Sequence, residues 1–189
     1  MIAVPTLVLL ALAARGDACY QQVPKSLREA MTAPVSGGAG LELPNEADNL
    51  PEDIAEDRKN GGTGCLGVAK ADFDGDGKQD IALVTTDSHG EVVLVAALAR
   101  GRSWKIEIVE YTHYAGREFV VIRPARPALY STDLSDRRVG IWTDVSPVDL
   151  KVWGLSVGDH DASSGPDLLY RLEEGRWRRV YSAHPWPRP

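Results

Sequence analysis

Four aspartates crowd into one short stretch of the chain, residues 71–84, with the sequence ADFDGDGKQDIALV. Counted from Asp72, carboxylates stand at positions 1, 3, 5 and 9, which are Asp72, Asp74, Asp76 and Asp80. Negative charges at this spacing repel one another unless a cation lies among them or water solvates each of them. The stretch is therefore either a cation-binding loop or a solvated turn that is rich in aspartate.

The spacing favours the cation-binding loop. Oxygens at positions 1, 3 and 5 can surround a hard cation, Gly77 at position 6 permits a sharp turn, and the backbone carbonyl of Lys78 at position 7 supplies a further oxygen. These features make up the first half of an EF-hand, but position 12 is Leu83 instead of Glu, and no helix pattern flanks the loop. Asp80 can close the coordination shell instead. Ligands that are all oxygens, in a flexible loop, favour Ca²⁺ over Zn²⁺ and Mg²⁺.

The pattern small residue–Asp–Phe–Asp–Gly–Asp–Gly–x–x–Asp, followed by an apolar strand, resembles the FG-GAP or VCBS repeat of integrin α-subunit propellers and of many bacterial secreted proteins. The resemblance covers about fourteen residues. It implies that Ca²⁺ is bound between two strands of a hairpin by the side chains of Asp72, Asp74, Asp76 and Asp80 and the backbone carbonyl of Lys78. We expect this calcium to have a structural role.

The resemblance does not extend to a full propeller. A propeller consists of several repeated blades, whereas this chain has one strong copy of the motif and is too short for a closed ring. The chain as a whole resembles small exported bacterial proteins that carry a single loop of this kind, and that resemblance implies no particular biochemical activity.

A second stretch, GDHDASSGPDLLY at residues 158–170, repeats the spacing in a weaker form. Its oxygen donors at positions 1, 3, 5, 7 and 9 are Asp159, Asp161, Ser163, the carbonyl of Gly165, and Asp167. Position 6 is Ser164, which fits the sharp turn less well than glycine, and Asp and Ser are common in ordinary turns. A second metal loop and a turn without metal are both open interpretations.

No catalytic motif accompanies the aspartates. The four histidines lie in separate segments without zinc-ligand spacing. We expect no nucleophile elbow, because the one G-x-S-x-G match, GLSVG at residues 154–158, falls in a β-rich segment. Tryptophans at four positions either stack on a sugar or, as is more common in a meander, belong to the core: Trp142, Trp153, Trp177 and Trp186.

The N-terminus has the features of an export signal. Residues 2–14 form an apolar run of signal-peptide length, too short to span a bilayer as a stable helix, and small residues follow it. No Lys or Arg precedes the run, so a buried N-terminal strand or helix is the alternative. Cys19 and Cys65 are the only cysteines, and in an exported chain they predict a disulfide. A lipidated Cys19 is a further alternative, although the sequence before it lacks the Leu of a lipobox.

Two short helices are expected near the N-terminus, in VPKSLREAM (23–31) and NLPEDIAEDRKNGG (49–62), with Asn49 as the cap of the second. Short β-rich segments separated by turns follow from residue 65, including EVVLVAALA (91–99) as a central strand and RVGIWTDV (138–145). The sequence therefore predicts a mainly β or α+β fold, an antiparallel meander with a calcium-binding hairpin loop. We assign residues 1–18 to a signal peptide, 19–182 to a single β-rich domain and 183–189 to a Pro-rich tail.

The net charge of −6 argues against nucleic acid as a partner. Arg176, Arg178 and Arg179 form a short basic run that we interpret as a solvated strand face. The leading hypothesis is a periplasmic or secreted, calcium-binding, disulfide-stabilised binding or accessory domain of the bacterial envelope, without a transmembrane anchor, whose partner is an envelope protein or glycan. The alternatives are an envelope hydrolase, or an inhibitor of one, with an unidentified site, and a purely structural envelope protein.

Overall fold

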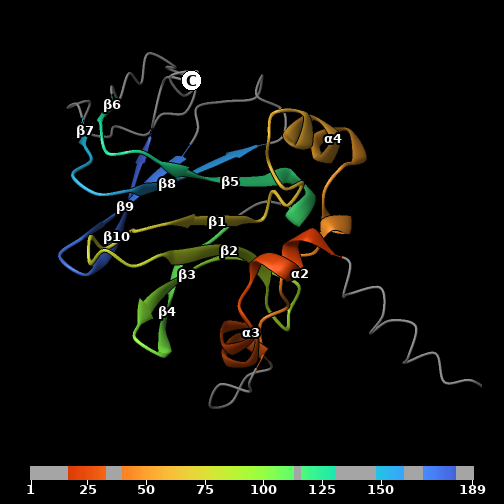
Figure 1. The fold of residues 1–189 in the computed structure, drawn as a ribbon, viewed down its shortest axis with the longest axis horizontal. Helices are drawn as coiled ribbons and strands as arrows, with labels where there is room; N and C mark the ends of the chain where they lie inside the picture. The colour runs from red at the N-terminus through yellow and green to blue at the C-terminus, as the bar shows by residue number, and fades with distance from the viewer. Residues whose placement is uncertain (1–16, 33–39, 113–115, 131–147, 160–167, 182–189) are drawn as a thin grey trace, which may run out of the picture.

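The computed structural model describes residues 17–32, 40–112, 116–130, 148–159 and 168–181. Within these ranges the chain is mainly β, with antiparallel strands in two four-stranded sheets and one two-stranded sheet (Figure 1). The predicted fold class is confirmed, and the described strands form neither a closed barrel nor a propeller. Among the described helices, none has the length and apolar character needed to cross a membrane.

The first sheet is a meander in the order β1-β2-β3-β4. Its strands are β1 (Val68–Ala71), β2 (Asp80–Thr86), β3 (Val92–Arg100) and β4 (Ser103–Tyr111). All residues of β3 except the last are buried, because the sheet is covered on both faces. The prediction of a central strand at this position is therefore confirmed.

The second sheet has the order β10-β9-β8-β5. Its strands are β5 (Val120–Ala125), β8 (Gly154–Asp159), β9 (Leu168–Glu173) and β10 (Arg176–Tyr181). Glu174 and Gly175 connect β9 to β10 with positive φ angles of 51° and 73°, as a two-residue hairpin turn requires. A small sheet of β6 (Leu129–Tyr130) and β7 (Val148–Asp149) packs next to the second sheet, where Val148 and Tyr130 contact Leu169 and Val180 in one apolar cluster.

The main core lies between the two four-stranded sheets. Phe73 is completely buried there, and its ring meets Trp177 edge-on with 5.9 Å between ring centroids. On one side of the molecule the sheets are joined by a backbone hydrogen bond from Ile122 N to Leu66 O (3.0 Å). Burying a ring such as that of Phe73 stabilises the folded state by about 1.5–3 kcal/mol.

On the other side of the molecule the sheets are joined through side chains. Trp177 Nε1 of β10 donates to Glu107 of β4 at 3.1 Å, and Arg179 of β10 donates to Glu110 of β4 at 2.6 Å. The arrangement is thus an open sandwich, with β1 next to β5 at one side and β4 facing β10 at the other.

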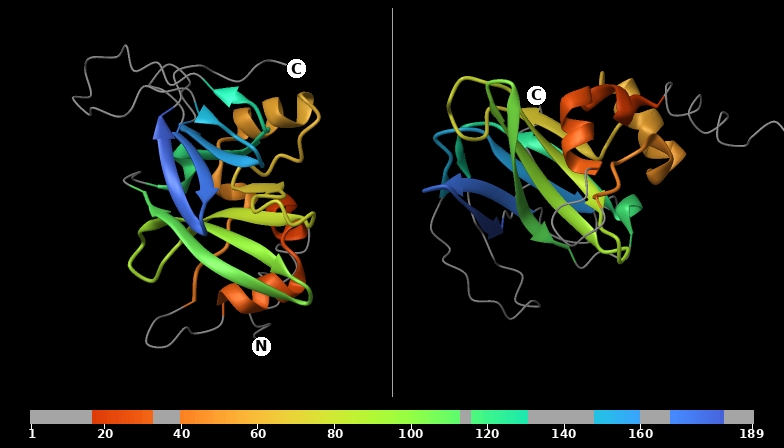
Figure 2. Two further views of the ribbon diagram at one scale, coloured as in Figure 1. Left: turned by 90° about the vertical axis from the view of Figure 1, so that its left-hand side faces the viewer. Right: turned by 90° about the horizontal axis from the view of Figure 1, so that it is seen from below.

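Helices cover the opposite face of the first sheet. Figure 2 (left) shows α3 (Lys25–Thr32) on the far side of this sheet from β8, β9 and β10. Leu27 and Met31 of α3 are buried against β2 and β3, because a separation of four residues places both side chains on one side of the helix. Val23, which precedes α3, is buried in the same cluster. Near the edge of the sheet, Trp104 of β4 donates its indole N–H to the hydroxyl of Ser26 (3.1 Å).

The two predicted helices are present as α3 and α4 (Pro51–Lys59). One detail was wrong: the N-cap of α4 is Leu50, and the buried Asn49 instead accepts a hydrogen bond from the Leu66 N–H (3.3 Å). The structure adds α2 (Ala18–Gln22), whose N-cap Asp17 accepts from the Tyr20 N–H. The predicted strand at 138–145 and the Pro-rich tail lie outside the described residues, as do residues 1–16 of the predicted signal peptide.

The disulfide predicted between Cys19 and Cys65 is confirmed, with Cα atoms 4.9 Å apart. It ties α2 to the segment that leads into β1, and Cys19 is completely buried. Closing a loop with a sequence separation of 46 residues stabilises the fold by roughly 4 kcal/mol on a chain-entropy argument. The alternative of a lipidated Cys19 is incompatible with this bond, because both use the same sulfur.

Candidate metal centre

The aspartate loop, which we define as residues 72–80, connects two strands that pair directly. The β1–β2 ladder ends with Ala71 opposite Asp80. Asp72 follows β1 immediately and Asp80 is the first residue of β2, so the hairpin itself brings these two carboxylates together. The residues between them form a short turn, which brings the carboxylate of Asp74 close to those of Asp72 and Asp80.

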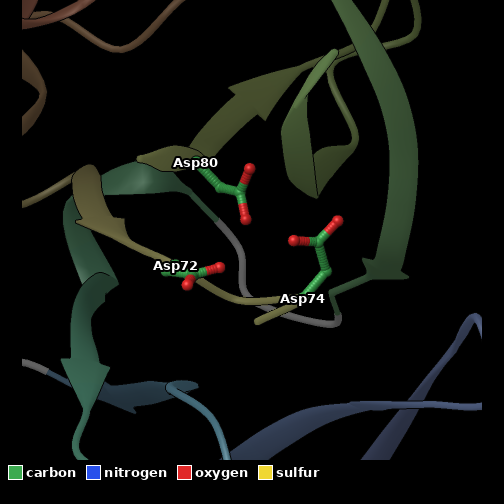
Figure 3. A group of neighbouring side chains, drawn as sticks. All are labelled: Asp72, Asp74 and Asp80. Carbon is green, nitrogen blue, oxygen red and sulfur yellow. The ribbon is translucent and has the colours of Figure 1, made fainter. Parts of the chain in front are cut away.

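Three of the four predicted carboxylates converge. Asp72, Asp74 and Asp80 each offer one oxygen, and these oxygens all lie within 4.8 Å of one another. Figure 3 shows the three carboxylates turned toward a common space, with Asp80 contributed by β2 and the other two by the loop. This separation is compatible with one cation bound between them, since Ca²⁺ is held by oxygens at 2.3–2.6 Å.

Asp72 organises the backbone of the loop. Its Oδ1 accepts the N–H groups of Gly75 (2.8 Å) and Asp76 (3.0 Å), and its Oδ2 accepts that of Gly77 (2.9 Å). Gly75 and Gly77 have φ angles of 76° and 82°, in the region that favours glycine. A Cβ at Gly75 would in addition lie 2.8 Å from a methyl carbon of Val152. The glycines are thus needed for the curl that brings the carboxylates together.

Asp80 is completely buried and connects the loop to the rest of the first sheet. Its Oδ2 accepts the N–H of Phe73 (2.9 Å), and its Oδ1 accepts the N–H of Ala99 on β3 (2.8 Å). Burial raises the pKa of Asp80 above its usual value, while these hydrogen bonds oppose that shift. The side chain therefore connects the start of β2 both to the aspartate loop and to β3.

Basic side chains neutralise part of the loop's charge. Arg100, the last residue of β3, donates to Asp74 at 2.6 Å and to Asp76 at 3.5 Å. Asp76 also pairs with the Lys78 ammonium at 2.6 Å, and its hydrogen bonds from Lys78 lower the pKa of this carboxyl. Asp76 is therefore not one of the three convergent carboxylates, and it pairs with Lys78 and Arg100 instead.

The donor set fits a calcium ion. Asp72, Asp74 and Asp80 present hard carboxylate oxygens, and the loop between them carries the backbone carbonyls that complete calcium shells in proteins. A cation in this position would compete with Arg100 for Asp74. The solvated-turn interpretation has support of its own, because Arg100, Lys78 and backbone N–H groups already relieve part of the repulsion.

The second predicted loop is only partly within the described residues. Asp159 is the last residue of β8, whereas Asp161, Ser163, Gly165 and Asp167 lie outside the described ranges.

Two of the four tryptophans are placed. Trp153 and Trp177 pack against the main core, as expected for tryptophans of a meander, while Trp142 and Trp186 lie outside the described residues. In the basic run, Arg176 and Arg178 are exposed and Arg179 pairs with Glu110.

Sequence reasoning missed Arg100 and the backbone N–H of Ala99. Both are provided by β3, about twenty residues after the loop, and become neighbours of the aspartates only through β2–β3 pairing. The residues around Arg100 form no motif that would have indicated this role.

Comparison with protein-family models gave no match, and searches of curated proteins and of solved structures found no similar chain.

Proposed function

We propose that the aspartate loop binds Ca²⁺ and that the metal stabilises the β1–β2 hairpin of an exported domain. The observation that carries the proposal is the convergence of Asp72, Asp74 and Asp80 within 4.8 Å at the junction of two paired strands. The spacing suggests two further ligands, the backbone carbonyl of Lys78 and the carboxylate of Asp76. The Asp76 carboxylate would first have to separate from the Lys78 ammonium. Bound calcium supplies positive charge that offsets the repulsion among these carboxylates.

The role that this site favours for a bound calcium ion is structural. An ion shared by Asp72 and Asp80 would link the end of β1 to the start of β2, and Asp80 already reaches β3 through Ala99. A metal held by several carboxylates has little remaining capacity to polarise a substrate. Binding to the folded state alone stabilises it by about 2.7 kcal/mol when free calcium exceeds Kd a hundredfold.

We further propose a periplasmic or secreted binding or accessory domain of the bacterial envelope, acting on an envelope protein or glycan. The disulfide between Cys19 and Cys65 supports an oxidising compartment. The apolar run at residues 2–14 supports export, and millimolar calcium outside the cytoplasm suits a modest oxygen-ligand site.

Calcium binding is tested by thermal unfolding of the purified protein with excess Ca²⁺ and with a chelator. We expect the melting temperature to fall by several degrees in the chelator, and isothermal titration to show one calcium site. Asp74→Ala should abolish both the calcium response and the titration signal, because it removes one of the three convergent carboxylates.

Asp87→Ala is the matched control. Asp87 also accepts backbone N–H groups in a tight hairpin turn, from His89 (2.8 Å) and Glu91 (3.0 Å), but it is not part of the convergent group. This variant should keep the calcium response of the native chain. Identical melting of the native protein with and without calcium, together with a flat titration, would refute the metal site.

A further inference from the structure

Strand β4 is a free edge of the first sheet within the described part of the chain. It pairs with β3 on one side, and no described strand pairs with its other side. Ile106 is 37% exposed and Ile108 is 51% exposed, both on the helix-covered side of the sheet, where Trp104 is half-buried. An edge that carries a row of apolar side chains is a template for another strand.

The backbone of β4 presents hydrogen-bonding groups to this open side. Arg100 and Ser103 close the two-residue turn between β3 and β4, so their pair is hydrogen-bonded and the next pair is not. By this alternation Trp104, Ile106 and Ile108 direct their N–H and C=O groups away from β3. The run ends at the register shift opposite Leu94 and Val95, which leaves residues 103–108 available.

We propose that β4 pairs antiparallel with β4 of a second copy of this chain, about a two-fold axis at Ile106. Charge complementarity selects this partner and register. With Ile106 opposite its own copy, Lys105 lies opposite Glu107 of the second copy, and the symmetry repeats the pair. Centring on Trp104 instead would place Lys105 opposite Ser103, and centring on Ile108 would place Glu107 opposite Val109.

The same register also buries the apolar row. On the helix-covered face, Trp104 lies opposite Ile108 of the second copy, and the two Ile106 side chains lie side by side, which is the arrangement that stabilises a sheet through cross-strand pairs. On the other face, Lys105 and Glu107 already pair within one copy at 2.5 Å, so the interface has four charges of alternating sign. The first sheets of the two copies become one continuous sheet, and the two-fold symmetry closes the assembly at a dimer. This inference is independent of the metal.

Cysteine cross-linking tests the register. In the proposed dimer the Cα atoms of the two Ile106 residues are about 5.5 Å apart, within disulfide range. The two Ile108 residues are offset by four positions along the strands, roughly 13 Å. Mild oxidation should convert Ile106→Cys to a covalent dimer and leave Ile108→Cys uncross-linked. Equal cross-linking of the two variants, or none of Ile106→Cys, would overturn the proposed pairing.

Charge reversal tests the partner. Lys105→Glu and Glu107→Lys each place like charges opposite one another, so sedimentation equilibrium should show dimerisation at least tenfold weaker than in the native chain. An equimolar mixture of the two variants should form a heterodimer, and the double variant should regain the native affinity. Circular dichroism of Glu107→Lys checks that loss of its bond to Trp177 leaves the fold intact.

A native chain that remains monomeric up to about 1 mM would overturn the proposal, even if β4 then binds a strand of another protein. Leu129→Lys, at a residue 70% exposed on β6, is the control for adding charge to an apolar surface position, and it should leave dimerisation unchanged.

Discussion

Asp80 combines two structural features at the end of the aspartate loop. Its carboxylate is one of three that converge, and it is also the buried acceptor for two backbone N–H groups, that of Phe73 in the loop and that of Ala99 on β3. Asp74, in contrast, bonds to the exposed side chain of Arg100. Residues of one type in one loop therefore differ in how much the fold depends on them.

This difference predicts distinct effects in the absence of calcium. Asp80→Ala leaves two buried N–H groups without their acceptor and should lower the free energy of unfolding by about 2–4 kcal/mol, measured by urea denaturation in a chelator. Asp74→Ala under the same conditions should unfold close to the native midpoint. Equal destabilisation by the two substitutions would show that the fold depends no more on Asp80 than on Asp74.

The contacts of Asp17 limit where a signal peptide could be cleaved from an exported chain. Its Oδ1 accepts from the Tyr20 N–H (2.8 Å) and its Oδ2 accepts from the Glu46 N–H (2.6 Å), so the carboxylate joins α2 to the segment before α4. Removal of residues 1–18, the boundary predicted from the sequence, would delete this carboxylate. We therefore expect cleavage before Asp17 if the chain is exported.

The intact mass of the protein recovered from the cell envelope tests this expectation. The mature chain should begin at Arg15, Gly16 or Asp17. A chain that begins at Cys19 would show that the Asp17 contacts are dispensable, and a chain that retains Met1 would contradict export by a cleaved signal.

At the scale of elements, the end of β3 provides the neighbour that decides how accessible the aspartate loop is to a cation. Arg100 lies at this end and donates to both Asp74 and Asp76. A guanidinium in this position reduces the repulsion among the carboxylates and competes with a metal for the same oxygens.

Arg100→Gln should therefore increase calcium affinity by about tenfold, because it removes a positive charge a few ångströms from the site. Isothermal titration at low salt measures the change. Arg102→Gln is the control, since Arg102 is an exposed arginine in the next turn and should leave the affinity unchanged. A weaker site in Arg100→Gln would mean that Arg100 organises the ligands instead of competing with the ion.

In the molecule as a whole, the short strand β1 is held at both ends. Cys65 of the disulfide lies shortly before Val68, where β1 begins, and Asp72 of the aspartate loop follows Ala71, where it ends. Because β1 pairs with β2 and lies beside β5, where Ile122 bonds to Leu66, these two constraints act at the side where the two large sheets meet.

Replacement of both cysteines by serine should lower the free energy of unfolding by about 2–5 kcal/mol, measured by chemical denaturation. A thiol assay on the unfolded native protein should detect no free thiol. Two reactive thiols, or an unchanged stability in the double variant, would contradict a bond that supports the fold.

Features that depend on short-range order could be predicted from the amino-acid sequence alone. The spacing of Asp72, Asp74 and Asp80 and the glycines between them are enough to predict a curled loop, and a chain with two cysteines permits only one internal pairing. The continuous apolar run of β3 likewise predicts a strand covered on both faces. Each of these inferences depends either on residues that are neighbours within one segment or on the number of cysteines.

Contacts between groups that are distant in the chain could not be predicted from the sequence and became visible only in the folded protein. The position of Arg100 beside Asp74 and Asp76 and the hydrogen bond from the Ala99 N–H to Asp80 both require the pairing of β2 with β3. The exposure of Ile106 and Ile108 likewise depends on where the helices end and on which strand lies at the edge. The physical reason is that packing between elements far apart in the chain sets these contacts, and no local pattern of residue types encodes them.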